Sequence, residues 1–390
     1  MSDDAAPYRF GIEEEFFLAD AETRGTPRRG LKAFHAAAGD RLDRVERELL
    51  QSQVEISTPP STRFDEAREI LGDLRAGLAG IGREHGILVF AAGTHPVACW
   101  SRQKPTEADR YERIMRELRM IGSRNVVCGL HVHVEVPDPA RRVNLMNRLG
   151  PFLPILLALS TSSPFWQARL TGLSCYRLCA YGEMPRTGLP DLFADAADYE
   201  RYLRVMIKAG AIPDASFLWW AIRPSKKYPT LELRVADSCT RLEDTLAIAA
   251  LYRCLVRLVD RRPDLHAGLT GASRAIAAEN LWRAQADGVG AEMIDEEGER
   301  AVPFAERLEA VLADIALDAD ALGCAAEVEA ARTIAATGTS SDRQMRVYRE
   351  ARGAASEATQ RRALNAVIDR LAAETASGAG ATRATVAMVG

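Results

Sequence analysis

The chain has 390 residues, 47% of them hydrophobic and 27% charged, a balance that excludes disordered, fibrous, membrane and disulfide-framework classes. Its 50 Lys and Arg residues against 54 Asp and Glu residues give a net charge of −4. Because no excess of cations is available to neutralise phosphates, a broad nucleic-acid surface is also excluded.

The expected compartment is the cytoplasm. The start MSDDAAPYRF is acidic and lacks the basic and then apolar pattern of a secretory signal. The longest apolar run, residues 152–159, contains a proline and is far shorter than the ~20 residues of a membrane span. The seven cysteines form no CxxC pair, which indicates neither a zinc knuckle nor a disulfide framework. We therefore expect no membrane partner.

Strand patterns prevail in the first part of the chain. Alternating or short apolar runs predict strands over residues 8–19, 53–57, 87–92, 126–136, 216–222 and 230–236. Helical spacing of apolar residues predicts helices over residues 63–85, 106–122 and 140–160. Thr106 is the predicted N-cap of the second helix, and two prolines make the third irregular.

Beyond residue 241 the pattern is almost entirely helical. The predicted helices cover residues 242–260, 273–284, 304–317, 320–336, 342–352 and 356–375. The last fifteen residues, 376–390, are rich in Ala, Gly and Thr and are expected to be a flexible tail. The chain shows neither an internal repeat nor a long linker, so residues 1–375 are expected to form one α+β catalytic domain with a helical C-terminal half.

Four of the predicted strands have an aliphatic face and a charged face. Side chains alternate along a strand, so residues two apart lie on the same face. The residues that share such a charged face are Glu13 and Glu15, then Glu55, then His131, His133 and Glu135, and finally Glu232 and Arg234. If these strands belong to one sheet, their charged faces combine into a single acidic wall.

An acidic wall indicates a bound cation. Carboxylates ~4 Å apart repel by about 1 kcal/mol in water and by several-fold more where solvent is excluded. Glutamates with one or two imidazoles suit Mg²⁺ or Mn²⁺. Each segment alone also fits a structural role, because alternating charge is typical of solvated strand faces, of core histidines and of ion pairs along a strand. The recurrence of one pattern in four segments favours a shared site.

Two loops add candidate ligand contacts. Arg223, Lys226 and Lys227 lie in a loop bounded by prolines, where cations could face phosphates or form an ordinary solvated turn. Residues 161–169, which include Trp166 and Arg169, combine hydroxyls, aromatic rings and a cation, as suits a small polar ligand or a turn after a helix. The sequence contains no P-loop and no GxGxxG after a first strand, so a nucleotide must be held in another way.

These motifs together resemble the YbdK-type carboxylate–amine ligases, also called glutamate–cysteine ligase family 2. The resemblance runs in order over residues 8–375 and is specific as a set. It is carried by GIEEEFFL (11–18), LLQSQVEISTPP (49–60), AAGTHP (91–96), CGLHVHVEVPD (128–138), STSSPFWQARLTGLSCYR (160–177), the segment from RPSKKYP to ALYR (223–253) and ENLWRAQADGVGAEMID (279–295).

The resemblance implies a glutamine-synthetase-like α+β fold, in which a curved, mostly antiparallel sheet has helices on its outer face and binds ATP and divalent cations on its concave face. It also implies an activity: such enzymes phosphorylate a carboxylate, typically the γ-carboxylate of glutamate, and an amine then attacks the acyl phosphate. The expected substrates are therefore a small carboxylate and an amine, with glutamate–cysteine ligase activity as one form.

The resemblance also assigns roles to individual residues. The metal ligands fall on Glu13, Glu15, Glu55, His131 and Glu232. Arg234 is the expected contact to the transferring phosphoryl group, with Lys226 and Lys227 as further contacts to ATP. Trp166, Arg169 and Arg177 are expected to contact the substrate, and His133 is the candidate to deprotonate the amine.

Some positions depart from the family pattern, and alternatives stay open. Glu135, Leu170 and the Lys226-Lys227 pair are atypical and put the usual substrate in doubt. One alternative activity is a metal-dependent phosphotransferase of the guanidino-kinase type. Another is a metal hydrolase that uses the HxH strand with Glu135. The amphipathic C-terminal helices could support a homodimer or simply cap the sheet.

Overall fold

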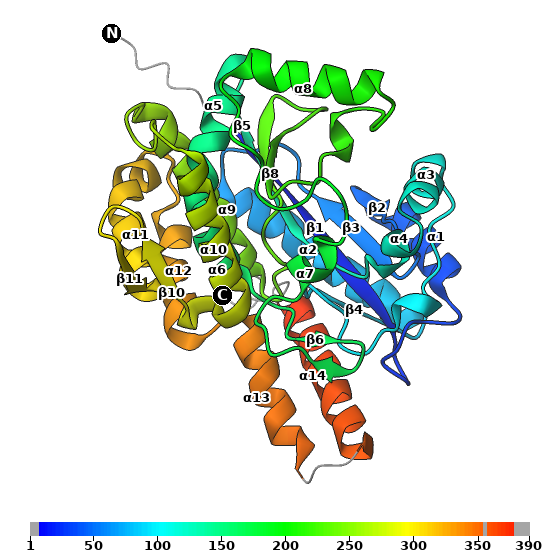
Figure 1. Ribbon diagram of the computed structural model, residues 1–390. Coiled ribbons are helices and arrows are strands. Elements are labelled where there is room, and N and C mark those ends of the chain that lie inside the picture. Colours follow the sequence, from blue (N-terminus) through cyan, green and yellow to red (C-terminus); the bar gives the residue numbers. More distant parts are fainter. Residues whose placement is uncertain (1–7, 354–356, 378–390) are drawn as a thin grey trace, which may run out of the picture.

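A seven-stranded antiparallel sheet forms the centre of the protein in this computed structural model, which describes residues 8–353 and 357–377 (Figure 1). The strand order is β2–β3–β1–β5–β9–β8, and β4 pairs with the end of β1 beyond β5. The strands are β1 (Phe10–Asp20), β2 (Val45–Arg47), β3 (Gln53–Ser57), β4 (Ile87–Phe90), β5 (Leu130–Glu135), β8 (Ile222–Pro224) and β9 (Thr230–Leu233). The long strand β1 therefore contacts three others and is the centre of the sheet.

Helices lie on both sides of this sheet. They are α1 (Leu31–Arg41), α2 (Phe64–Glu84), α3 (Asp109–Leu118), α4 (Met120–Arg124), α5 (Pro139–Leu149), α6 (Leu153–Ser160), α7 (Arg177–Tyr181), α8 (Ala196–Lys208), α9 (Leu242–Arg261), α10 (Gly271–Asp287), α11 (Phe304–Ala321), α12 (Ala325–Thr337), α13 (Ser340–Arg352) and α14 (Glu357–Ser377). Helices α2 and α9 pack against one face of the sheet, α3 and α7 border a cavity on the other face, and further helices surround them. Two small hairpins pair β6 (Phe165–Trp166) with β7 (Arg169–Leu170) and β10 (Glu292–Asp295) with β11 (Arg300–Pro303).

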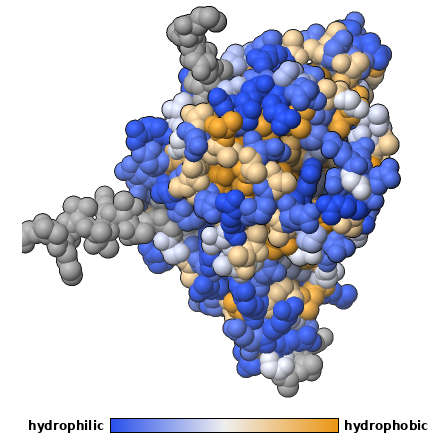
Figure 2. Space-filling view, turned by 90° about the vertical axis from the view of Figure 1, so that its left-hand side faces the viewer, coloured by the Kyte–Doolittle hydropathy of each residue, from blue (hydrophilic) through white to orange (hydrophobic). Residues whose placement is uncertain are grey.

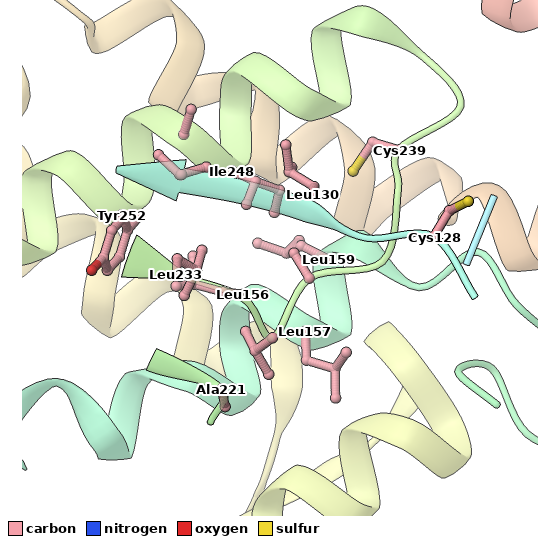
Figure 3. Close-up of a cluster of buried hydrophobic side chains, with 14 of the residues drawn as sticks. Cys128, Leu130, Leu156, Leu157, Leu159, Ala221, Leu233, Cys239, Ile248 and Tyr252 are labelled. Atoms are coloured by element: carbon pink, nitrogen blue, oxygen red, sulfur yellow. The ribbon is translucent and has the colours of Figure 1, made fainter. Parts of the chain in front are cut away.

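The core lies between the aliphatic face of the sheet and helices α6 and α9. Figure 3 shows Leu130 of β5 and Leu233 of β9 meeting Leu156 and Leu159 of α6 and Ile248 of α9. All five are almost completely buried, and each such side chain contributes about 1.5–3 kcal/mol relative to exposure. Because side chains alternate along a strand, this burial turns the charged residues of the same strands to the opposite face. The expected α+β sheet with helices on its outer face is thus confirmed.

Two element predictions are wrong. Residues 216–222 were expected to form a strand, but a 3₁₀ turn occupies Ala215–Phe217 because the Asp214 side chain accepts a hydrogen bond from the Ser216 N–H. Thr106 is not an N-cap, since α3 begins only at Asp109 and the Thr106 hydroxyl donates instead to the Glu48 carbonyl.

The remaining differences lie at element ends. The expected helix 106–122 is divided into α3 and α4 at Arg119, whose φ of 55° lies in the left-handed region and interrupts the helical backbone. Helices α1 and α8 were not predicted. The first two residues of the expected tail, 376 and 377, belong to α14, and residues 378–390 lie outside the described residues.

One helical stretch, Pro139–Ser160, is long and apolar enough by length and composition to cross a membrane. However, 78% of its most apolar window is buried inside the protein. A buried core helix of a folded domain meets the same criteria of length and composition. Its apolar surface therefore serves packing in this structure. The face that carries α10, α11 and the β10–β11 hairpin shows apolar side chains among charged ones (Figure 2), and Trp282 and Leu317 are exposed on these two helices.

Candidate active site

The register of the central strands brings the charged residues side by side. Glu15 lies opposite Glu55, Glu13 opposite His131, and His133 opposite Glu232. Directly opposed residues have Cβ atoms about 4.5–5.5 Å apart, so the four strands β3, β1, β5 and β9 form one continuous charged surface. We call these six residues the acidic wall.

The acidic wall lines a cavity of about 640 Å³. The same cavity is also lined by cations, among them Lys226, Lys227, Arg177, Arg223 and Arg234. Two of them, Arg223 and Arg234, contact the Glu232 carboxylate. All predicted metal-ligating residues, the predicted proton acceptor and the predicted ATP contacts are therefore brought to a single cavity.

Two groups within the acidic wall have the arrangement of metal sites. Glu13, His131 and Glu232 offer ligand atoms that lie within 4.8 Å of one another, and so do Glu15, Glu55 and His131. His131 belongs to both groups. The two groups therefore overlap at His131, whose neutral ring has one nitrogen lone pair to offer a cation.

The electrostatics of the wall fit a bound cation. Burial raises the pKa of Glu15 to about 8, and the neighbouring Glu48 adds to the effect. Burial, with Glu48, Glu13 and Glu15 close by, also raises the pKa of Glu55 well above its ordinary value. Both groups resist ionisation where no cation compensates their charge. A set of carboxylates with an imidazole is the donor set that Mg²⁺ or Mn²⁺ accepts.

The two histidines contact their neighbours through both ring nitrogens. His131 Nδ1 lies 3.4 Å from Glu13 Oε2, and His133 Nδ1 lies 2.9 Å from the Thr230 hydroxyl. In the described part of the chain, Nε2 of both rings is buried and makes no well-aligned hydrogen bond, although it lies 3.6 Å from Glu15 Oε1 in His131 and 3.3 Å from Glu13 Oε1 in His133. Burial alone would raise the pKa of Glu13, but its contacts with the two imidazoles outweigh burial and lower that pKa. The acidic wall thus holds buried imidazole nitrogens next to carboxylate oxygens, an arrangement that a bound cation would satisfy.

Glu232 is paired more closely than the sequence indicated. Arg223 donates two hydrogen bonds to its carboxylate at 2.8 and 3.0 Å, and Arg234 contacts the same group. Burial would raise the pKa of Glu232, but these two arginines hold it well below its ordinary range. Arg234 also donates to the Tyr181 hydroxyl at 3.2 Å. A carboxylate kept ionised in this way can still offer an oxygen to a cation.

The predicted substrate contacts do not all reach the cavity. Arg177 lines it, and its guanidinium packs so closely over Gly129 that a Cβ at that position would lie 2.2 Å from Arg177 Nη2. Trp166 and Arg169 lie on the β6–β7 hairpin, outside the cavity lining. The Trp166 ring packs on Tyr176 at 5.3 Å, and Arg169 is exposed.

Glu135 lies apart from the site. Arg9 holds its carboxylate with hydrogen bonds of 2.6 and 3.0 Å, and Glu135 does not line the cavity of the acidic wall. The HxH strand therefore does not assemble His131, His133 and Glu135 into one metal site. Leu170 is exposed on the β6–β7 hairpin, whereas Lys226 and Lys227 do line the cavity.

Sequence reasoning missed several residues of this cavity. Glu46 and Glu48 lie beside Glu55, and Arg110 and Tyr111 of α3 face them. Glu48 follows the short strand β2 and lies two residues beyond Glu46, the same spacing as between the two glutamates of β1 that belong to the acidic wall. That spacing was the signal in the sequence, but the arginine between Glu46 and Glu48 interrupts the aliphatic face.

Comparisons with known proteins identify the family of this chain. The glutamate–cysteine ligase family 2 matches residues 9–362. A protein of Bradyrhizobium diazoefficiens named "Putative glutamate--cysteine ligase 2" is 47% identical over 350 residues, which is 89% of this chain and 81% of that protein. A protein of Rhodospirillum rubrum with the same name is 43% identical over 96% of this chain and 97% of its own length.

Two solved structures share the fold at low sequence identity. A glutamate–cysteine ligase from Francisella tularensis in complex with AMP has a TM-score of 0.62 and 12% identity, covering 95% of this chain and 93% of that one. A bifunctional glutathione synthetase from Pasteurella multocida has a TM-score of 0.66 and 16% identity over 94% of this chain, which spans about half (52%) of that enzyme. The chain belongs to glutamate–cysteine ligase family 2, a family of ATP-dependent ligases that form carbon–nitrogen bonds.

Proposed function

We propose that this protein joins a small carboxylate to an amine through an acyl phosphate, with ATP as phosphoryl donor. The observation that carries the proposal is the pair of ligand groups around His131, set in one cavity with several cations. In the first step a carboxylate oxygen attacks the γ-phosphorus of ATP and ADP leaves. In the second step the amine nitrogen attacks the acyl carbon, phosphate leaves and the amine loses a proton.

The acidic wall would hold magnesium or manganese through Glu13, Glu15, Glu55, His131 and Glu232. A divalent cation supplies charge neutralisation for the ATP phosphates and for the oxygens that gain charge in the transfer. Glu15 and Glu55, whose pKa values are raised by burial and like charge, would ionise fully when that cation is present. Glu48, next to both, is a further candidate ligand.

The cations that line the cavity would orient the phosphates. We assign Arg234 to the transferring phosphoryl group, because its guanidinium is fixed by Glu232 and Tyr181. A fixed donor stabilises developing charge without reorganising. Lys226 and Lys227 line the same cavity and are assigned to the ATP phosphates.

His133 is our candidate for the group that takes the proton from the amine. Its Nδ1 is fixed by the Thr230 hydroxyl at 2.9 Å, and its Nε2 lies 3.3 Å from Glu13 Oε1. For the substrate we assign Arg177, which lines the cavity, as a contact to the carboxylate. Trp166 and Arg169 do not line the cavity, so the structure supports a substrate contact for them less well than for Arg177. Glutamate and cysteine are the substrates we test first, because the relatives carry that name.

The decisive experiment measures ADP release with Mg²⁺ and ATP, and identifies the product by mass. ADP should form only when a carboxylate and an amine are both present, and the product mass should equal their sum less one water. ADP formation with a guanidino compound alone would favour the phosphotransferase of the guanidino-kinase type. Turnover that needs Zn²⁺ but no ATP would favour a hydrolase. The cytoplasmic location and the homodimer stay predictions. A measurement of the mass of the protein in solution would test the homodimer.

A further inference from the structure

A second large cavity lies at the end of β1 opposite the one occupied by the acidic wall. Its volume is about 980 Å³, and it shares no lining residue with the cavity of the acidic wall. Asp20, which lines it, is five residues beyond Glu15 on β1, or about 17 Å at the ~3.3 Å rise of a strand. A ligand in this cavity would therefore not touch the acidic wall.

The charge of this second cavity is strongly one-sided. Six cations line it: Arg28, Arg29, Lys32, Arg102, Lys104 and Arg361. The one carboxylate, Asp20, already accepts hydrogen bonds from the Thr23 N–H at 2.8 Å and from the Glu22 N–H at 3.1 Å. In the described part of the chain, no carboxylate lies within ion-pairing distance of Arg28, Arg29, Lys32, Arg102 or Lys104. We call this the basic cavity.

The basic cavity is held open by a polar floor. The Ser52 hydroxyl donates to Gln103 Oε1 at 2.7 Å, and Gln103 Nε2 donates to the Thr26 hydroxyl at 2.7 Å and to the Cys99 carbonyl at 3.2 Å. These bonds connect the segment around Ser52 with the two segments that carry five of the cations, residues 26–32 and 99–104. On one side Arg361 of α14 donates to the Thr23 carbonyl at 2.8 Å. The fold thus fixes the backbone segments that bring the cations together, while five of the cationic side chains are exposed, namely Arg28, Arg29, Lys32, Arg102 and Lys104.

Helix α1 adds to the positive potential. It begins after Gly30, whose φ of 83° requires the left-handed conformation, and no side chain caps its first turn. The first turn of a helix carries unpaired N–H groups and a partial positive charge. Gly30, Leu31 and Lys32 all line the basic cavity, so this end of α1 faces the same space as the arginines.

We propose that the basic cavity binds a small molecule with at least two phosphate groups. A phosphate monoester carries a charge of about −1.5 to −2 at neutral pH, so two such groups supply roughly what five unpaired cations require. Carboxylates carry −1 each, and four or five would have to fit the same space. A concave site of this size in a chain with net charge −4 favours a small polyanion over a nucleic acid, which needs an extended cationic surface.

The test uses inorganic tripolyphosphate as the probe and isothermal titration calorimetry on the full chain. EDTA is present throughout, so that metal-dependent binding to the acidic wall does not contribute. The parent should bind one tripolyphosphate in about 0.15 M salt. The variant with Arg29→Gln, Lys32→Gln and Arg102→Gln should bind at least roughly tenfold more weakly, since charge-assisted hydrogen bonds to phosphate are lost. These side chains are exposed, and a thermal melt should show unchanged folding.

Two controls make the result specific. A variant with Arg204→Gln, Lys208→Gln and Arg349→Gln removes the same charge from exposed positions on α8 and α13 and should bind within about twofold of the parent. A variant with Lys226→Gln and Lys227→Gln alters the catalytic cavity and should also keep binding. Equal loss in both charge-matched triple variants, or loss only in the Lys226/Lys227 variant, would overturn the proposal. So would a parent that binds no tripolyphosphate, or one that binds tricarballylate as tightly.

Discussion

Both faces of β1 bury a glutamate, but the glutamate on one face has a cationic partner and the glutamate on the other face lies among further carboxylates. On the helix-covered face, Glu14 is 1% exposed and is satisfied by Arg75 at 2.9 Å and by the Thr245 hydroxyl at 2.6 Å. On the cavity face, Glu15 is surrounded by Glu48 and Glu55, and burial raises its pKa to about 8. A buried carboxylate with a partner serves the fold, whereas neighbouring buried carboxylates without enough partners leave room for a cation.

The largest expected effect is the loss of activity on substitution of Glu13, which lies next to Glu14 in β1 but on the cavity face. Glu13→Gln should reduce ADP release by roughly a thousandfold or more, since a lost metal ligand costs several kcal/mol of transition-state stabilisation. Its melting temperature without metal should change little or fall slightly, because the glutamine keeps the shape of the side chain but loses the charge that His131 and His133 contact. Steady-state kinetics and a thermal melt in EDTA check both parts. Retained turnover would remove Glu13 from the proposed site.

Breaking the pair on the other face should cost stability. Arg75→Met leaves Glu14 buried without its partner and removes donors from the Thr240 and Cys239 carbonyls. The free energy of unfolding should fall by about 3–5 kcal/mol, as for other broken buried pairs. The double change Glu14→Met with Arg75→Met should recover much of this loss. If urea denaturation gave equal losses in the single and double variants, the buried charge would not be the cause.

Substitution of Arg234 examines the role of the cations that line the cavity, whereas substitution of Glu13 examines that of the carboxylates. Arg234→Ala should lower kcat for ADP release by roughly 10²–10³-fold, the range for loss of one fixed donor to transition-state charge. Because Arg223 still holds Glu232 with two hydrogen bonds, the fold should be little affected. Single-turnover phosphoryl transfer at saturating ATP is the measurement. A change in KM alone would assign Arg234 to ground-state binding only.

Magnesium should weaken the pH dependence of stability. The pKa of Glu15 rises from about 4.5 in the unfolded chain to about 8 in the folded one, so the folded state binds more protons between these values. Stability of the metal-free protein should therefore fall as pH rises from about 5 to 8. At about 100 times its Kd, Mg²⁺ should add about 2.7 kcal/mol and flatten this fall, as denaturation at several pH values will reveal. An identical pH slope with and without Mg²⁺ would contradict the cation site.

Strand alternation predicted the wall because its cause is local. Once Ile12 and Phe16 are buried against helices, Glu13 and Glu15 must face the other way. The position of Trp166 and the role of Arg223 depend on how distant segments return to the sheet, and no local period encodes that. The strand expected at residues 216–222 failed for a local reason instead, since the Asp214 side chain caps a 3₁₀ turn there by accepting a backbone hydrogen bond, and the apolar run does not show this.

The smallest expected effect concerns the rim of the catalytic cavity. Lys226 Nζ lies 2.7 Å from Asp214 Oδ2, with 55% and 29% of the two side chains exposed. Asp214→Asn should change the free energy of unfolding by less than about 1 kcal/mol, as is typical of an exposed pair. It should lower KM for ATP, because Lys226 no longer divides its charge between Asp214 and a phosphate, whereas Lys226→Ala should raise KM. ATP titrations of both variants decide the matter. If neither KM moved, Lys226 would serve only to hold its own loop against Asp214.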